Sequence, residues 1–170
     1  MKNGTKLAFA AIALIGFSSS SFAQATATAT ATATIVTPIS ITKTVDMNFG
    51  NVAVQTATGG TVVLTPLGVR SVTGGVTLPA IFGTVTAATF TVNGQGTYTH
   101  AITLPAAATT LTSGANTMTA DTWTSSPSAT GVLTAGTQTL NVGATLNVAA
   151  AQAAGLYVSG TPFSVTVNYN

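Results

Sequence analysis

Apolar and polar residues alternate along much of the chain, with apolar side chains on one parity and Thr, Ser or Asn on the other. Successive side chains of an extended strand point to opposite faces, so this pattern predicts strands with one buried face. Thr and Val, which favour pleated strands, are abundant, and this predicts an all-β chain. The clearest faces are Tyr98, His100, Ile102 and Leu104; Leu140, Val142, Ala144, Leu146 and Val148; and Phe163, Val165, Val167 and Tyr169.

Turn residues such as Gly-Gly, Ser-Gly and Pro divide these runs at short intervals. Further strands are expected at residues 45–49, 61–65, 76–78, 84–92 and 117–124. The Asn-Gly-Gln-Gly run at residues 93–96 predicts a hairpin turn between two alternating runs. Residues 149–154 have a helix-like composition but are long enough for only a turn or two. Many short strands with such punctuation predict an antiparallel sandwich or a small barrel.

The first residues predict a secretory signal peptide over residues 1–23. Lys2 and Lys6 precede an apolar run at residues 7–17, and small residues lead to a cleavage site between Ala23 and Gln24. The apolar run is shorter than the roughly 20 residues that span a bilayer, although a retained membrane anchor is the alternative. We therefore expect an exported protein of the cell surface, extracellular space or periplasm, with no transmembrane segment in its mature form.

Removal of the signal peptide would leave a formally neutral chain, because Lys43 and Arg70 balance Asp46 and Asp121. The absence of a basic cluster argues against nucleic acid as a partner. A chain without Cys has neither disulfides nor zinc-thiolate sites. Near-zero net charge removes the repulsion that keeps copies apart, and this suits a protein that associates with itself.

An uninterrupted Ala-Thr repeat follows the predicted cleavage site and continues in phase into an Ile-rich run. In an extended chain this segment presents one apolar edge and one Thr edge. Residues 24–38 are therefore predicted to be an extended N-terminal segment, before a domain at residues 39–170. The segment could add a strand to the sheet of a neighbouring copy, which would give a head-to-tail homopolymer. A flexible leader or an edge strand of its own domain is the alternative. The candidate intersubunit residues are Ala25, Ala27, Ala29, Ala31, Ala33, Ile35, Ile39 and Ile41.

Ionisable side chains are too few to predict an enzyme, and no residue is predicted to be catalytic, cofactor-binding or metal-ligating. The mature chain has one His and two Asp, and neither a nucleophile elbow nor a phosphate-binding loop occurs. His100 lies on the apolar parity of its strand, as expected of a buried or boundary histidine with a hydrogen-bond partner. Trp123 shares parity with Asp121 and is the best candidate for a recognition residue on the solvent side, with a packing role as the alternative.

Both ends of the mature chain resemble a family of secreted bacterial proteins known as domain of unknown function 4402. The resemblance rests on Ala-Thr-Ala-Thr-Ile-Val-Thr-Pro-Ile-Ser-Ile-Thr at residues 31–42, Asp-Met-Asn-Phe-Gly at 46–50 and the closing run from Gly160. It implies an exported β-sandwich of a Gram-negative bacterium and carries no enzymatic residues. The run Phe-x-Val-x-Val-x-Tyr at residues 163–169 is also similar to the last strand of chaperone-usher and spore-coat-U-like pilins, although the Cys pair of many such pilins is missing.

These observations together predict an immunoglobulin-like antiparallel β-sandwich with an extended N-terminal strand. The expected function is that of a structural subunit of a surface or extracellular fibre assembled by strand exchange, with a periplasmic chaperone as a possible partner. A monomeric secreted adhesin or carbohydrate-binding module is the alternative, and in that case Trp123 would matter and the N-terminal segment would not.

Overall fold

The computed structural model describes residues 23–170. The predicted signal peptide falls almost wholly on residues 1–22, outside the described residues. Contacts divide the chain into two units, Met1–Thr34 and Ile35–Asn170. No helix within residues 23–170 is long and apolar enough to cross a membrane.

The second unit is built from antiparallel strands, which confirms the all-β prediction. Their alternation of buried and exposed side chains follows the sequence pattern most closely in strand β11 (Thr137–Val148), where every second residue from Leu140 to Val148 is buried. The strands are β1 (Ser40–Val45), β2 (Ala53–Val54), β3 (Gly60–Leu64), β4 (Arg70–Gly74), β5 (Val76–Thr77), β6 (Ala88–Asn93), β7 (Thr99–Thr103), β8 (Thr109–Ser113), β9 (Asn116–Ser126), β10 (Thr130–Val132), β11 (Thr137–Val148), β12 (Val158–Ser159) and β13 (Thr166–Tyr169).

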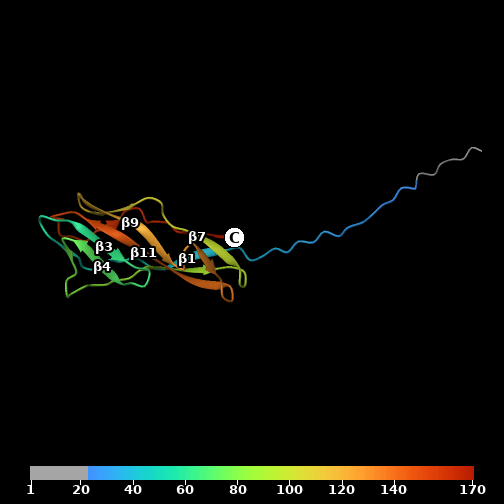
Figure 1. The fold of residues 1–170 in the computed structure, drawn as a ribbon, viewed down its shortest axis with the longest axis horizontal. Coiled ribbons are helices and arrows are strands. Elements are labelled where there is room, and N and C mark those ends of the chain that lie inside the picture. Colours follow the sequence, from blue (N-terminus) through green and yellow to red (C-terminus); the bar gives the residue numbers. More distant parts are fainter. Residues whose placement is uncertain (1–22) are drawn as a thin grey trace, which may run out of the picture. The chain divides into compact units, whose positions relative to one another are not determined.

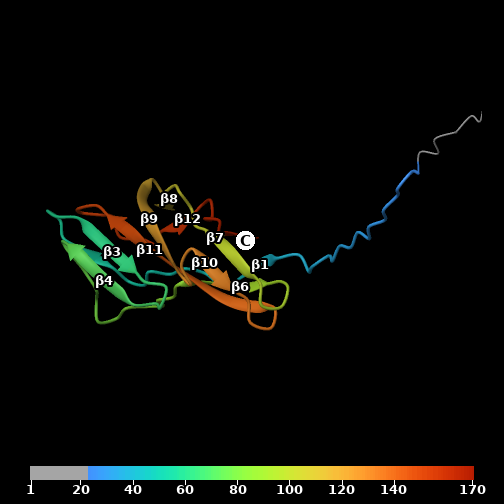
Figure 2. The same ribbon diagram turned by 45° about the vertical axis from the view of Figure 1, so that its right-hand side comes forward.

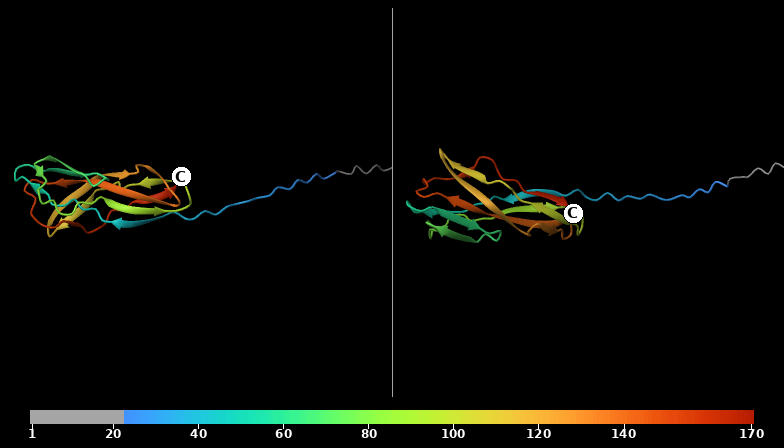
Figure 3. Two further views of the ribbon diagram at one scale, coloured as in Figure 1. Left: turned by 90° about the horizontal axis from the view of Figure 1, so that it is seen from below. Right: turned by 45° about the horizontal axis from the view of Figure 1, so that its top comes forward.

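Strand β11 is the centre of the largest sheet, which has the order β1-β6-β11-β9-β8-β12 (Figures 1 and 2). Its first half pairs with β6, its second half pairs with β3, and β9 lies along it from Asn141 to Asn147. Strand β4 continues the sheet beyond β3. Two smaller sheets, β10-β7-β13 and β2-β5, complete the unit. The turned views in Figure 3 show the long orange strand β11 crossing the domain.

The apolar core consists of two clusters that share β11. The first cluster contains Ala144, Leu146 and Val148 together with side chains of β3, β5 and β9. The second contains Leu140 and Val142 together with side chains of β6, β7 and β13. Since the second cluster draws residues from the largest sheet and from the β10-β7-β13 sheet, these two sheets pack face to face, as in a sandwich.

The prediction of a hairpin at residues 93–96 is wrong. Strand β6 ends at Asn93 and β7 begins at Thr99, but β6 pairs with β1 and β11 whereas β7 pairs with β10 and β13. The turn therefore carries the chain from one sheet to the other. Local sequence defines the turn but leaves the partners of its flanking strands open, because the partners come from distant parts of the chain.

A bulge in β9 changes which parity of that strand faces the core. Gly143 pairs with Thr124 and Thr145 pairs with Asp121, so β9 has one extra residue between these pairs, and Thr122 there has a φ of 50°. Before the bulge Ala120 is buried, whereas after it Trp123 packs against both core clusters. The bulge therefore turns Trp123 inward, although its parity in the sequence predicts the solvent side.

Removal of the Leu140 side chain tests the importance of β11. Leu140 is fully buried in the second cluster, so Leu140→Ala should lower the free energy of unfolding by about 2–5 kcal/mol. The neighbouring Thr139 is exposed, and Thr139→Ser should change it by less than about 1 kcal/mol. Urea unfolding followed by circular dichroism measures both. Equal losses in the two variants would contradict the placement of β11.

Candidate assembly surface

The predicted intersubunit residues fall into two groups with different environments. Residues 23–34 form no strand or helix, and each of them is exposed, Ala25 through Ala33 included. Ile35 is 96% exposed. Ile39 and Ile41, in contrast, are half-buried against the second core cluster, and Ile41 pairs with Val92 of β6. The apolar edge of the predicted segment is thus used by the chain's own domain only from Ile39 onward.

Three residues that are distant in the sequence hold the chain where it enters the domain, and we call them the Tyr169 clasp. The Tyr169 hydroxyl donates to the Thr37 carbonyl at 2.8 Å and accepts from the Gln95 backbone N–H at 2.6 Å. The Gln95 Oε1 atom accepts from the Thr37 hydroxyl at 2.8 Å and from its backbone N–H at 3.2 Å. The clasp joins the start of the domain to the last strand, β13.

The local sequence explains how the clasp fits together. Gly94 lies so close to Tyr169 that a Cβ atom there would collide with its hydroxyl, so a residue with a side chain would displace the ring. The Tyr169 ring also packs edge-on against Tyr98, with 5.6 Å between ring centroids. The sequence placed Tyr169 on the apolar face of the last strand, and nothing in it linked this residue to Thr37 or Gln95.

Strands β1 and β13 each have one edge that no strand occupies within residues 23–170. Strand β1 pairs only with β6, and β13 pairs only with β7. The two strands lie in contact with each other, and apolar side chains from the first and last parts of the domain pack against the same core cluster. These side chains are Ile39, Ile41, Phe163, Val165 and Tyr169. Open edges beside half-buried apolar side chains are places where a further strand can pair.

Trp123 lies half-buried at the junction of the two core clusters. The centroids of its ring and the Phe163 ring are 4.4 Å apart, and its indole N–H donates to the Ala107 carbonyl at 3.3 Å. These contacts give Trp123 a packing role. A role in recognition stays a prediction.

The charged side chains of the domain form one ion pair and otherwise contact uncharged groups. Lys43 forms an exposed ion pair with Asp46 at 2.6 Å, and Arg70 donates to the carbonyls of Phe49 and Asn51. Asp121 accepts from the Asn147 amide at 2.9 Å. No cluster of three potential metal ligands occurs among the described residues.

Among residues 23–170, His100 is the one buried polar residue of the core, and it lies on β7, between β10 and β13. Burial lowers the pKa of its imidazole below the ordinary value, so the ring is neutral at pH 7. The sequence predicted this burial from the parity of the strand. The predicted hydrogen-bond partner is wrong, because neither ring nitrogen is hydrogen-bonded within residues 23–170.

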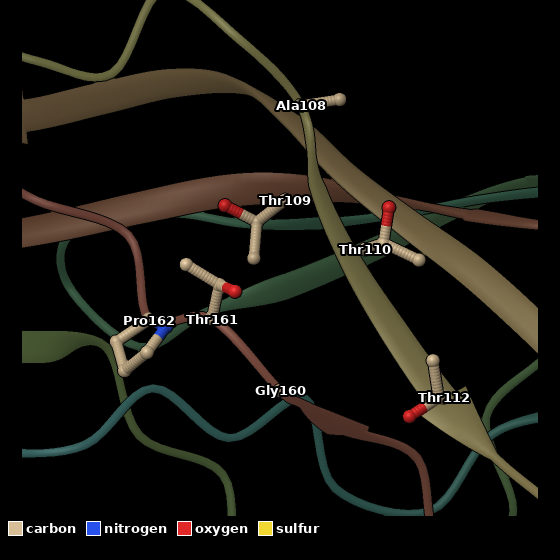
Figure 4. Close-up of a pocket in the computed structure, with 7 residues that line it drawn as sticks. All are labelled: Ala108, Thr109, Thr110, Thr112, Gly160, Thr161 and Pro162. Carbon is tan, nitrogen blue, oxygen red and sulfur yellow. The ribbon is translucent and has the colours of Figure 1, made fainter.

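Two shallow depressions mark the surface of the domain. One, of about 370 Å³, lies between β8 and the segment that follows β12, and Figure 4 shows its small uncharged side chains. The other, of about 410 Å³, is lined by residues of β3, β9 and β11 and of the segment after β11. Neither contains a residue that the sequence singled out as a candidate for binding or catalysis.

Comparison with known proteins relates this fold to a family. The model of the family described as Domain of unknown function (DUF4402) matches residues 39–169. The chain belongs to this family. The match begins one residue before β1 and ends within β13, so the DUF4402 region includes both open edges. No curated protein and no solved structure matches the chain.

The clasp can be tested in this DUF4402 chain with Tyr169→Phe, which keeps the ring and removes the hydroxyl. The Gln95 N–H and the Thr37 carbonyl would each lose a partner, so the free energy of unfolding should fall by about 1–3 kcal/mol. Amide exchange at Gln95 should become faster at the same time.

Tyr157→Phe is the matched control, because the Tyr157 hydroxyl bonds to Ala153 and Gln152 outside the clasp. This variant should leave amide exchange at Gln95 unchanged. If Gln95 exchanges equally fast in both variants, the clasp does not hold this part of the chain. Amide exchange followed by mass spectrometry gives the comparison.

Proposed function

We propose that the chain is an exported, non-enzymatic subunit of a surface or extracellular fibre, in which the N-terminal segment of one copy pairs as a strand with the next copy. The observation that carries this proposal is the exposure of residues 23–34, which form no strand or helix. Their Ala side chains all share one parity, so an extended segment would present one apolar edge. Strand pairing would satisfy their backbone groups, and it would cover the row of Ala methyl groups.

The open edges of β1 and β13 support this proposal by offering a place for the incoming strand. Both edges border the second core cluster, so a strand added there would pair through its backbone and place alternate side chains over half-buried apolar residues. The contact would join two different surfaces of the subunit. Such a contact is heterologous, and it grows as a filament when rotation does not close it into a ring.

The side chains of the segment differ in what they can contribute. Burial of a single methyl group contributes about 0.8 kcal/mol, whereas burial of an Ile side chain contributes about 1.5–3 kcal/mol. Ile35 is the largest exposed side chain on the apolar parity of this segment. We therefore assign Ile35 the role of main anchor. The small Ala side chains keep the rest of the segment narrow, so that it can fit a tight site.

Two further points from the sequence support a fibre subunit. The mature chain would be formally neutral, so charge repulsion would not oppose close association of many copies. The closing run at residues 163–169 is similar to the last strand of chaperone-usher and spore-coat-U-like pilins. On this proposal a periplasmic chaperone would cover the open edges before assembly, although the absence of the Cys pair distinguishes the chain from many such pilins.

The phase of the repeat provides a sharp test. One triple variant carries Ala27→Asp, Ala29→Asp and Ala31→Asp. It places three charges on the apolar edge and should abolish filaments of the mature protein. A second triple variant carries Thr28→Asp, Thr30→Asp and Thr32→Asp. It places three charges on the opposite edge, and filaments should persist. Negative-stain microscopy and size-exclusion chromatography distinguish the outcomes.

This pair of variants separates strand pairing from simple charge repulsion, because both carry the same net charge. Filaments lost equally in both would contradict the phase argument. Filaments retained in both would exclude the segment as the connecting strand. If the unmodified mature protein is a stable monomer, the fibre proposal fails and a monomeric binding module becomes the better interpretation.

The anchoring role of Ile35 gives a second prediction. Ile35→Thr keeps a β-branched residue but removes apolar surface, so the fraction of protein in filaments should fall while the melting temperature of the unassembled subunit stays the same. Leu67, in the turn between β3 and β4, is 81% exposed, and Leu67→Thr serves as a control that should leave assembly unchanged. Sedimentation of filaments measures the fraction; equal effects of the two substitutions would indicate general loss of surface hydrophobicity.

A further inference from the structure

His100 lies in a fully buried position where its ring has no polar partner. Its exposure is 0%, and neither ring nitrogen forms a hydrogen bond within the described residues. The ring lies over Gly131 of β10, where an added Cβ atom would be 2.5 Å from both Cε1 and Nε2. The Oε1 atom of Gln138, from β11, borders the same position, is buried, and also lacks a partner in the described part of the chain.

The position of His100 connects it directly to the Tyr169 clasp. His100 is the cross-strand partner of Gly131 on one side and of Tyr169 on the other, so it lies at the centre of the β10-β7-β13 sheet. Tyr169 in turn bonds to Thr37 and Gln95. His100 on β7 is thus separated from Thr37 by one residue, Tyr169 on β13. A shift of the His100 ring can therefore move Tyr169 and break its hydrogen bond to Thr37.

The surroundings of His100 offer no charge to compensate a proton on the ring. From β13 the facing titratable group is the Tyr169 phenol, and the Tyr98 phenol packs against it. Strand β10 contributes Gly131 and β11 contributes the neutral Gln138 amide. Burial is the sole cause of the lowered pKa of His100, so neither a carboxylate nor a cation contributes. A charged imidazolium in this position would be desolvated without an ionic partner.

We propose that His100 is a buried acid sensor that controls the Tyr169 clasp. When the ring takes a proton from solvent, the β10-β7-β13 sheet loosens, and the Tyr169 hydroxyl releases Thr37 and Gln95. The consequence for fibres rests on the proposed function, because Thr37 is the point from which the segment enters the domain. Acid would then weaken both the anchor of the outgoing segment and the open edge of β13 that receives the incoming one.

The direction of the effect follows from the lowered pKa. The unfolded chain binds the proton more readily than the folded chain does, so the contribution of His100 to stability is fully present above the ordinary value of 6.5 and is lost as the pH falls below it. The loss continues until the pH reaches the lower, folded pKa. For a chain of this size, a pKa lowered by about one corresponds to a fall in melting temperature of about 4 °C.

The small number of acidic and imidazole groups makes the test specific. His100 is the sole histidine of the sequence, and Asp46 and Asp121 are its only acidic side chains. The mature protein should show a melting temperature that is constant above pH 6.5 and falls below it. His100→Leu, which keeps an apolar side chain in the core, should show no such fall between pH 6.5 and 5. The double variant Asp46→Asn with Asp121→Asn should retain it. An undiminished fall in His100→Leu would overturn the proposal.

A second measurement does not depend on how well His100→Leu folds. In the mature protein, the single imidazole signal in the NMR spectrum reports protonation of His100, and amide exchange reports the hydrogen bond from Gln95 to Tyr169. The exchange at Gln95 should become faster over the same pH range in which the imidazole titrates, while exchange at Leu146, in the first core cluster, should stay slow. Protonation without any change at Gln95 would overturn the link to the clasp. Both measurements can be made whether or not filaments form, so they fail independently of the fibre proposal.

Discussion

The alternation of side chains along β11 is the constraint on which the rest of the domain depends. Its buried residues, spaced two apart from Leu140 to Val148, line both core clusters, so neither cluster can form without this strand. A shift of one residue would turn the whole row to the opposite face. Gly143 marks the point where the strand changes partner from β6 to β3, and a Cβ atom there would collide with the Leu64 carbonyl. Glycine at this position lets the end of β3 approach closely.

The central position of β11 determines which strands are left with open edges. With β6, β3 and β9 against it, the outer positions fall to strands that pair on one side only, among them β1 from the start of the domain and β13 from its end. These two strands lie against the same core cluster because the face-to-face packing of the two sheets brings the first and last strands of the domain together. The Tyr169 clasp is the polar counterpart of that arrangement, since it connects residues 132 positions apart.

The sequence predicted the elements whose signals are local, and it failed where distant parts of the chain decide the outcome. The row in β11 and the burial of His100 follow from period-two alternation alone. Strands β4 and β8 escaped prediction because Arg70 and several Thr residues obscure the alternation there. The partners of the turn at residues 93–96 depend on pairings across the whole domain, and the inward position of Trp123 depends on a bulge that inserts one residue into β9. Neither event leaves a signal in a window of a few residues.

The candidate site shows the same division. The sequence alone predicts the apolar edge of the N-terminal segment from its alternation. The clasp, in contrast, requires Thr37, Gln95 and Tyr169, which only the fold brings together. Natural proteins protect open edges with Lys or Pro, and here Lys43 lies on β1 and Pro38 precedes it, while β13 has neither. Strand β13 is only four residues long, so a strand that paired with it alone would form few hydrogen bonds. In the proposed assembly an incoming strand would gain enough contact only if β1 contributed as well, and the Tyr169 clasp connects β13 to Thr37, three residues before β1.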